Sequence, residues 1–299
     1  MTIILPKEHY AFELLKKKRI EVMSIDDALH QDIRALRIGI LNIMPKAEVY
    51  DFNLLFSLGR SLLQIDPVWI RLKTYDYITT DRDYIDSLYI HFDGAIKNRI
   101  LDGFIVTGAP VEDIPYEEVG YWGELKNILS YARKNIASTL GICWGGLALA
   151  KMLGIEKVKY SKKLFGVFES YNINREHPIT GELDDIFYCP QSRHAGIPDE
   201  MLEKEQDKGN VNLLAYSKEA GYFIFESADR RFLINLGHFE YNSRRLVEET
   251  LRDREKKRKD VEDPVNFDIN NPVNRWRGNR NEFFTQWIKF VYDHTDLTK

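Results

Sequence analysis

The sequence predicts an α/β protein with a mostly parallel central sheet and helices on both faces. Three observations lead to this fold class. Apolar runs typical of buried strands alternate with helix-like segments between residues 37 and 153. A glycine-flanked cysteine, Cys143, stands between the last of these strands and its helix. After Gly154 the pattern changes to short strands joined by turns, which predicts an antiparallel extension of the sheet in the C-terminal half.

The predicted elements follow one another in a regular order. Residues 1–36 are expected to form an N-terminal arm with helices near 11–18 and 25–30. The parallel half is expected to contain the strands 37–43, 68–72 and 103–107, the helices 51–63 and 117–134, and then the strand, turn and helix around Cys143. The second half is expected to contain the strands 165–171, 212–216, 222–226 and 232–236, a charged helix at 243–257, a Pro/Asn/Asp loop at 263–273 and an amphipathic helix at 282–292. We expect a single domain over residues 1–299, with the segment 258–299 packing back on the body.

Composition argues against several classes of protein. The chain has 299 residues, 44% of them hydrophobic, which is enough for a large core. Its net charge of −4 gives no basic field for nucleic acid. No window approaches the roughly 18 to 20 apolar residues of a membrane span, and the first residues do not resemble a signal peptide. The two cysteines, Cys143 and Cys189, indicate a reducing compartment, and neither has metal-ligand spacing with a histidine. We therefore expect a cytoplasmic protein that binds no metal.

Residues 136–146 read Ile-Ala-Ser-Thr-Leu-Gly-Ile-Cys-Trp-Gly-Gly, which predicts a strand, a tight turn at Cys143 and a helix. Glycines around the cysteine tolerate the backbone angles that such a turn requires. The turn lifts the sulfur above the sheet and points the N-terminus of the next helix at it, which favours the thiolate. The alternative is a buried structural cysteine, since free cysteines are among the most buried residues.

A second motif, Gly237-His-Phe-Glu-Tyr241, follows the predicted strand 232–236. On an extended backbone, residues two apart point to the same side, so we expect His238 and Glu240 to face one site. Together with Cys143 they supply a nucleophile, a base and a carboxylate that orients the base. A His-x-Glu sequence alone is common. It indicates a catalytic site here because it follows the glycine-flanked cysteine turn in the same chain.

Ligands of open α/β sheets bind at the carboxyl ends of the strands. The segments 44–46 and 107–112 and the cysteine turn are expected there. The backbone N–H of Ala109, together with that of Trp144, predicts an oxyanion hole for a tetrahedral intermediate. The alternative is an ordinary strand–helix loop in which Gly108 serves only the turn.

With these motifs in place, the chain resembles the homoserine O-acyltransferases, or homoserine transsuccinylase family. The resemblance extends from about residue 30 to residue 287. It rests on the segments Leu41-Asn-Ile-Met-Pro-Lys46, Val106-Thr-Gly-Ala-Pro-Val-Glu112, Tyr121-Trp122, Ile142-Cys-Trp-Gly145, Lys163-Leu-Phe-Gly-Val167, Pro190-Gln-Ser-Arg193 and Gly237-His-Phe-Glu-Tyr241. It implies a class I glutamine amidotransferase-like (flavodoxin-like) form of the predicted sheet.

The resemblance also implies a mechanism. Cys143 takes an acyl group from coenzyme A as a thioester, with His238 as general base and acid and Glu240 as its orienting carboxylate. The hydroxyl of an amino acid then attacks the thioester in a ping-pong cycle. Acetyl-CoA is expected as a cosubstrate, with no bound cofactor, and the family's usual homodimer is expected here.

Further site residues follow from the same resemblance. Lys163, Ser192 and Arg252 match substrate-contacting positions, and a guanidinium can pair with an α-carboxylate. Without the resemblance, Lys163 and Ser192 are ordinary surface polar residues. The charged stretch 252–260 is otherwise expected to be a solvated face.

Glu112 stands at the position associated with acyl specificity, and relatives with glutamate there rather than glycine generally use acetyl-CoA. A carboxylate beside the acyl pocket removes room and repels the carboxylate of a succinyl group. The alternative is a solvated residue in an acidic stretch that includes Asp113, Glu117 and Glu118.

The chain departs from the family pattern near the expected acceptor site. Tyr50, Asp51 and Asn53 replace a Thr-Glu pair and a Gln, Phe239 replaces a proline, and 146–148 replaces a Gln-containing helix start. If Tyr50 lines an acceptor pocket with Lys46, its bulk favours an acceptor shorter than homoserine. The resemblance as a whole predicts a homoserine O-acetyltransferase. The bulk of Tyr50 leaves serine O-acetylation as the alternative. Glutamine amide hydrolysis and a noncatalytic binding role are further alternatives.

Overall fold

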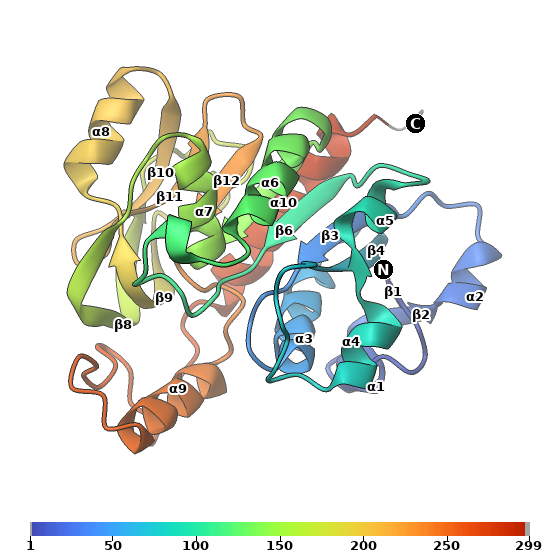
Figure 1. The fold of residues 1–299 in the computed structure, drawn as a ribbon, viewed down its shortest axis with the longest axis horizontal. Helices are drawn as coiled ribbons and strands as arrows, with labels where there is room; N and C mark the ends of the chain where they lie inside the picture. Colours follow the sequence, from blue (N-terminus) through green and yellow to red (C-terminus); the bar gives the residue numbers. More distant parts are fainter. Residues whose placement is uncertain (1, 297–299) are drawn as a thin grey trace.

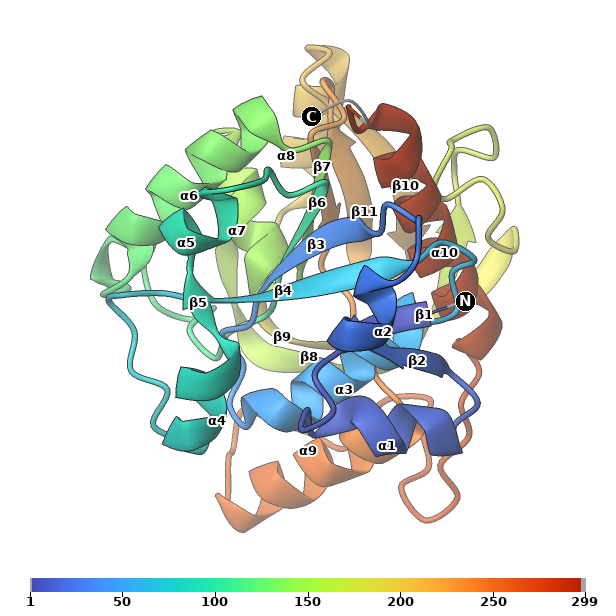
Figure 2. The ribbon, with the colours of Figure 1, turned by 90° about the vertical axis from the view of Figure 1, so that its right-hand side faces the viewer.

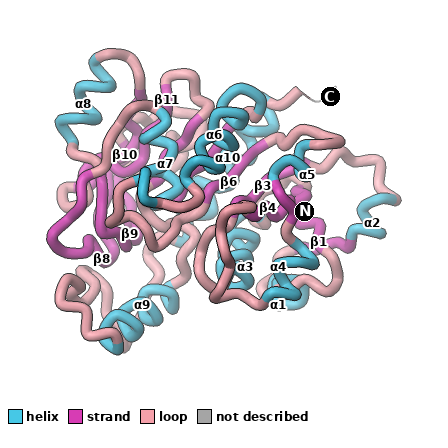
Figure 3. Tube along the Cα trace, in the orientation of Figure 1, coloured by secondary structure: helices cyan, strands magenta, loops and turns pink. Residues whose placement is uncertain are grey.

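The computed structural model describes residues 2–296, so residue 1 of the expected N-terminal arm and residues 297–299 of the expected C-terminal segment lie outside it. Figure 3 shows strands and helices alternating along the first half of the chain. The strands are β1 Thr2–Leu5, β2 Glu21–Ser24, β3 Leu36–Leu41, β4 Ile65–Arg71, β5 Ile90–His91, β6 Gly103–Val106, β7 Ser138–Ile142, β8 Val158–Asn172, β9 Ile186–Gly196, β10 Val211–Ser217, β11 Gly221–Ser227 and β12 Phe232–Asn235. The helices are α1 Ala11–Lys17, α2 Ile25–Leu29, α3 Ala47–Leu58, α4 Arg82–Leu88, α5 Phe92–Ile96, α6 Trp122–Asn135, α7 Trp144–Met152, α8 Asp199–Asp207, α9 Ser243–Glu255 and α10 Arg277–His294, with a 3₁₀ turn at Tyr116–Glu118.

All the described strands belong to one sheet, in the order β2-β1-β4-β3-β6-β7-β12-β11-β10-β8-β9, with β5 beside β4 (Figure 1). Pairing is parallel from β2 through β7 to β12. It is antiparallel from β12 through β11, β10 and β8 to β9. The predicted fold class, a mostly parallel sheet with an antiparallel extension in the C-terminal half, is confirmed.

Two layers of helices cover the parallel half of the sheet. Figure 2 shows α6 and α7 on one side of the strands and α10 on the other. The latter layer also contains α3 and α1, since α10 packs on α3 and α3 packs on α1. The central strands β3, β6, β7 and β12 are buried almost throughout, as expected for strands covered on both faces. No helix within residues 2–296 is both long and apolar enough to cross a bilayer.

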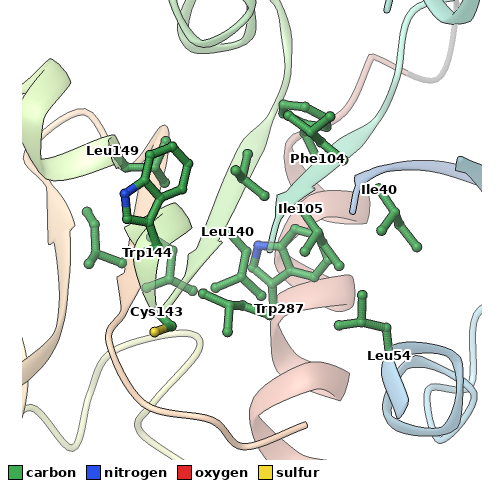
Figure 4. Packing of buried hydrophobic residues seen from close by; sticks show 14 of the residues in the cluster. Ile40, Leu54, Phe104, Ile105, Leu140, Cys143, Trp144, Leu149 and Trp287 are labelled. Atoms are coloured by element: carbon green, nitrogen blue, oxygen red, sulfur yellow. The ribbon is translucent and has the colours of Figure 1, made fainter. Parts of the chain in front are cut away.

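The core continues to the edge of the predicted site. Figure 4 shows Trp144 and Trp287 on opposite sides of Leu140, with the sulfur of Cys143 at the edge of the labelled side chains. The Trp287 indole donates a hydrogen bond to Ser138 Oγ at 3.1 Å, which fixes α10 against the start of β7. Cys143 is therefore supported by a rigid, fully packed core.

Some elements differ from the prediction. The expected N-terminal arm contributes two sheet strands, β1 and β2, which the sequence hides because each is only four residues long. Strand β9 was not predicted, because Pro190 and the polar residues after it interrupt the apolar pattern. Its Arg193 is nevertheless buried, since the guanidinium donates to Tyr160 Oη and to the carbonyl of Ala220.

The helix after Cys143 approaches β6 so closely that Gly145 has no room for a side chain. A Cβ on Gly145 would lie 2.2 Å from the Val106 carbonyl oxygen and 2.7 Å from that of Thr107, both backbone atoms. Only a shift of α7 or β6 can relieve such a contact, and overpacking of this kind typically costs about 1–3 kcal/mol.

We therefore expect Gly145→Ala to lower the free energy of unfolding by about 2–3 kcal/mol, and the melting temperature by about 5 °C. The matched control is Gly123→Ala in α6, where an added Cβ meets nothing within 4 Å and alanine favours the helix. Thermal unfolding followed by circular dichroism measures both variants. Equal stability of the two would contradict the close approach of α7 to β6.

Candidate active site

Cys143 occupies the expected turn between β7 and α7. Its backbone has φ 52° and ψ −113°, a conformation that L-residues rarely adopt. The turn is held by two backbone hydrogen bonds, from Cys143 N–H to the Asn235 carbonyl at 2.8 Å and from Leu147 N–H to the Cys143 carbonyl at 3.0 Å. Backbone strain of this kind persists only where the surroundings impose it, and it clusters at functional sites. The strand, turn and helix predicted from the glycines are present.

His238 and Glu240 form a buried pair after β12. The Nδ1 atom of His238 lies 2.6 Å from Glu240 Oε1, and the two residues are 2% and 1% exposed. The expected extended backbone is wrong, because the pair lies in a turn closed by the hydrogen bond from Tyr241 N–H to the His238 carbonyl. The side chains meet through this turn and not through strand alternation. The His238 N–H donates to the Pro190 carbonyl at 2.8 Å, which fixes the turn on β9.

The electrostatics of the pair favour a charged imidazole. Burial favours its neutral form, but the Glu240 carboxylate and the sulfur of Cys143, through charge and hydrogen bonds, raise the pKa of His238 to about 10. His238 is thus an imidazolium at neutral pH. The sulfur of Cys143, the N-cap residue of α7, lies beside this imidazolium. The three residues expected from the sequence are therefore brought together.

A cavity of about 340 Å³ opens over the sulfur. Its wall includes the predicted residues Cys143, His238, Ala109, Glu112, Lys163, Ser192 and Arg252. These residues come from the turn after β12, the loop after β6, the cysteine turn, β8, β9 and α9. A second cavity of about 410 Å³, lined in part by Arg71 and Tyr77, contains none of the predicted residues.

The predicted substrate-contacting residues meet two carboxylates that the sequence analysis missed. Lys163 Nζ lies 2.9 Å from Asp253 Oδ2 and 3.6 Å from Glu249 Oε2, and Ser192 Oγ donates to Glu249 Oε2 at 2.6 Å. Burial alone favours a protonated Glu249, but Lys163, Arg245 and the Ser192 hydroxyl outweigh it and lower the pKa of Glu249 to about 2. Glu249 and Asp253 stand four residues apart on one face of α9. Charged residues surround them in the sequence, so no pattern distinguished them.

The charged stretch 252–260 is exposed except for Asp253 and the partly buried Asp260, as expected of a solvated face, but some of its cations also border the cavity. Lys256 and Arg258 lie on the cavity wall together with Arg252. The Arg252 side chain is 44% exposed, and its guanidinium lies 3.0 Å from Asp253 Oδ1. The cationic end of α9 therefore borders the cavity.

Glu112 also lies on the cavity wall and is 9% exposed, which differs from a solvated loop residue. Its Oε1 accepts a hydrogen bond from the His194 N–H at 3.4 Å. The ammonium of Lys157 donates to the carbonyl oxygens of Glu112 and Ile114, which holds the loop in place. The carboxylate thus has a defined position within the cavity that contains Cys143.

The expected oxyanion-hole residues flank Cys143. The N–H of Trp144 begins α7, where the first N–H groups have no intrahelical acceptor. Ala109 is 5% exposed and lies on the cavity wall. Its neighbour Gly108 is so near that an added Cβ would lie 3.5 Å from the Cβ of Cys143.

Tyr50 and Lys46 lie elsewhere than expected, because neither is among the residues of the cavity wall. Tyr50 is 2% exposed, and its hydroxyl donates to Glu240 Oε1 at 2.7 Å. It lies in the first turn of α3 and contacts the carboxylate behind the imidazole. Lys46 precedes α3 in a left-handed conformation, with its N–H donating to Thr79 Oγ1.

Tyr241 is a further residue that the sequence analysis missed. Its ring stacks on His238, with centroids 4.1 Å apart and planes inclined by 23°. Its hydroxyl donates to Glu249 Oε1 at 2.9 Å. The ring therefore connects the imidazole with the carboxylates of α9.

The mostly parallel sheet with its antiparallel extension and covering helices has the class I glutamine amidotransferase-like fold. Solved structures agree on the fold. A glutamine amidotransferase from Thermotoga maritima has a TM-score of 0.56 at 14% identity, covering 87% of this chain and 99% of its own. A glutamine amidotransferase from Methylobacillus flagellatus has a TM-score of 0.51 at 14% identity, covering 88% and 94%.

Sequence comparison identifies the family. The family model described as homoserine O-succinyltransferase matches residues 2–297. A homoserine O-acetyltransferase of Clostridium botulinum (strain Eklund 17B / Type B) is 39% identical and covers 100% of both chains. That of Bacillus subtilis (strain 168) is 38% identical over 99% of this chain and 98% of its own. The chain belongs to the homoserine O-succinyltransferase family, which confirms the resemblance inferred from its motifs.

The charge on His238 predicts how the reactivity of Cys143 depends on pH. The pKa of His238 is raised to about 10, so the imidazolium is present between pH 6 and pH 9 and is lost only above that range. We expect the rate of Cys143 alkylation by iodoacetamide to fall less steeply from pH 8 to pH 6 in the wild type than in His238→Asn, which lacks the cation beside the sulfur.

Mass spectrometry of the labelled peptide measures these rates. Cys143→Ser is the control, because the remaining Cys189 is fully buried and burial raises the pKa of its thiol. Identical pH profiles for wild type and His238→Asn would show that the imidazolium does not activate the sulfur.

Proposed function

We propose that this protein transfers an acetyl group from acetyl-CoA to the hydroxyl of L-homoserine, using Cys143, His238 and Glu240. The observation that carries the proposal is the contact of the Cys143 sulfur with an imidazolium held by a carboxylate, within a cavity that contains Lys163 and Arg252. Full-length relatives named homoserine O-acetyltransferase supply the substrate pair.

In the first half-reaction, the Cys143 thiolate attacks the thioester carbonyl of acetyl-CoA. Negative charge develops on the carbonyl oxygen, and the N–H groups of Ala109 and Trp144 donate to it. The tetrahedral intermediate collapses by breaking its bond to the sulfur of coenzyme A. His238 gives its proton to that leaving sulfur, which leaves acetyl-Cys143 and a neutral imidazole.

In the second half-reaction, the neutral His238 takes the proton of the homoserine hydroxyl as the oxygen attacks acetyl-Cys143. Collapse releases O-acetylhomoserine and restores the thiolate beside an imidazolium. Glu240 fixes the ring through Nδ1 and leaves Nε2 for the reacting atoms.

Recognition of the amino acid follows from the charges on the cavity wall. The part-exposed guanidinium of Arg252 binds the α-carboxylate of the acceptor through paired N–H groups. The carboxylates of Asp253 and Glu249 balance the charge of the Lys163 ammonium group. The main effect of Lys163 is therefore to hold both carboxylates at the cavity. Asp253 then offers an oxygen to the α-ammonium group.

Specific observations argue against serine O-acetylation and against glutamine amide hydrolysis. Serine as acceptor requires Tyr50 to narrow the acceptor pocket, yet Tyr50 is buried against Glu240 and is not part of the cavity wall. Amide hydrolysis rests on the shared fold alone, since the amidotransferase structures are only 14% identical to this chain. The proposal also keeps the homodimer and the cytoplasmic location as predictions.

The test is release of free coenzyme A from acetyl-CoA by the purified protein, with homoserine, with serine, with glutamine or with no acceptor. We expect release that depends on homoserine. Cys143→Ala should abolish transfer, His238→Ala should lose most of it, and Glu240→Ala should lose less, because orientation is a smaller share of the barrier. Wild-type turnover in Cys143→Ala would exclude the thioester mechanism, and dependence on serine would replace the acceptor.

Glu112 predicts the choice of acyl donor. Its carboxylate repels the terminal carboxylate of a succinyl group within a partly desolvated cavity. We expect Glu112→Gly to raise the ratio of kcat/KM for succinyl-CoA over acetyl-CoA by about tenfold or more. The matched control is Glu117→Gly, whose side chain is 71% exposed and off the cavity wall. An equal ratio in both variants would remove Glu112 from donor selection.

A further inference from the structure

One oxygen atom of Glu240 receives two hydrogen bonds. Oε1 accepts from the hydroxyl of Tyr50 at 2.7 Å and faces His238 Nδ1 at 2.6 Å. The other oxygen, Oε2, is buried and has no hydrogen-bond partner within the described part of the chain. Tyr50 is thus the one residue besides His238 that hydrogen-bonds the Glu240 side chain among residues 2–296.

Tyr50 approaches Glu240 from a distant part of the chain. It lies in the first turn of α3, 190 residues before its partner. One turn further along α3, Asn53 Oδ1 accepts a hydrogen bond from Asn242 Nδ2 at 3.1 Å. These two contacts fix α3 to both ends of the segment 240–242. The Tyr50 ring is 2% exposed, so its hydroxyl cannot swing away without opening the core.

We propose that Tyr50 is a positioning residue for acyl transfer: its hydroxyl holds the Glu240 carboxylate in alignment, and thereby keeps His238 directed at Cys143. This inference rests on the triad of the proposed function. It assigns a defined effect to a residue that touches neither the cavity nor, in the proposed reaction, either substrate.

The chemistry of the contact supports this effect. A buried carboxylate needs hydrogen-bond donors to remain charged, and a neutral hydroxyl is such a donor. Burial and the charge of Glu240 raise the pKa of Tyr50 well above its ordinary value, so the hydroxyl keeps its proton at any pH at which the enzyme works. Without it, the charged His238–Glu240 pair loses a hydrogen bond that stabilises it.

The surrounding titratable groups define what else affects the pair. They are His238 and Tyr241 on the same turn, Tyr50 on α3, Cys143 on the cysteine turn and Cys189 on β9. Removing the Tyr50 hydroxyl leaves the other titratable groups in place. A change in the pH dependence of acetyl transfer or alkylation can therefore be attributed to the loss of this hydroxyl.

Tyr50→Phe is the direct test, because it removes the hydroxyl and keeps the ring. We expect kcat for transfer to homoserine to fall about tenfold to a hundredfold, with KM changed less than about twofold. The acid limb of the pH profile should move to higher pH. The matched control is Tyr116→Phe, which removes another buried hydroxyl, one that donates to the Leu147 carbonyl at 2.8 Å. Tyr116→Phe should leave the position of the acid limb unchanged.

A second measurement separates this inference from the proposed function. Alkylation of Cys143 by iodoacetamide needs no substrate, and its acid limb should also move to higher pH in Tyr50→Phe. Wild-type protein that is alkylated but transfers no acetyl group would overturn the proposed reaction, while the shift in Tyr50→Phe would still support the positioning role. Alkylation and turnover profiles equal to those of Tyr116→Phe would overturn it.

If Tyr50→Phe does not fold, 3-fluorotyrosine at position 50 keeps the test decisive. Fluorine makes the hydroxyl a stronger donor without removing it. The acid limb should then move to lower pH, and a limb that stays in place would contradict the proposal.

Discussion

The hydrogen bond between His238 and Glu240 places two charges inside a protein core. The side chains around the pair offset the free-energy cost of burying these charges. An isolated buried charge is expensive, and a buried pair is stable only if its geometry and further hydrogen bonds offset the loss of water. Here the pair has the Tyr50 hydroxyl on one side, the ring of Tyr241 stacked on the imidazole and the Cys143 sulfur beyond it. The arrangement is therefore one unit, in which each group depends on the charge state of its neighbours.

A second buried charge cluster lies across the cavity and has a different character. Lys163, Arg245, Glu249 and Asp253 bring two cations against two carboxylates, which lets α9 present charged side chains at a largely buried surface. Tyr241 connects this cluster with the imidazole, because its ring stacks on His238 and its hydroxyl donates to Glu249. A substrate charge that changes the electrostatic potential at α9 would therefore also act on His238, through the ring of Tyr241.

The sequence predicted the parts of the site that local rules determine. The glycines around Cys143 indicate a tight turn wherever the chain leads, and the turn is present. His238 and Glu240 were paired correctly but for the wrong reason, since a turn after β12 brings them together and a two-residue period does not. Tyr50 was expected to line an acceptor pocket with Lys46, and its contact with Glu240 could not be predicted because the two residues stand 190 positions apart in the chain. Lys163 and Asp253, 90 residues apart, present the same difficulty within a strongly charged stretch.

The two halves of the sheet contribute different residues to the site, which explains why the fold alone does not determine the substrate. The parallel half supplies the cysteine turn and the loop of Ala109, which any attack on a carbonyl carbon can use. The antiparallel half and α9 supply Lys163, Ser192 and Arg252, which line the same cavity. An amidotransferase structure with the same fold covers 87% of this chain at only 14% identity, whereas a full-length homoserine O-acetyltransferase is 39% identical over all of it. In the proposed reaction, specificity for the acceptor depends on the charges of α9, and the nucleophile depends on the turn at Cys143. The segment 238–241 joins the two parts, since it contains the proposed base His238 and contacts Glu249 through Tyr241.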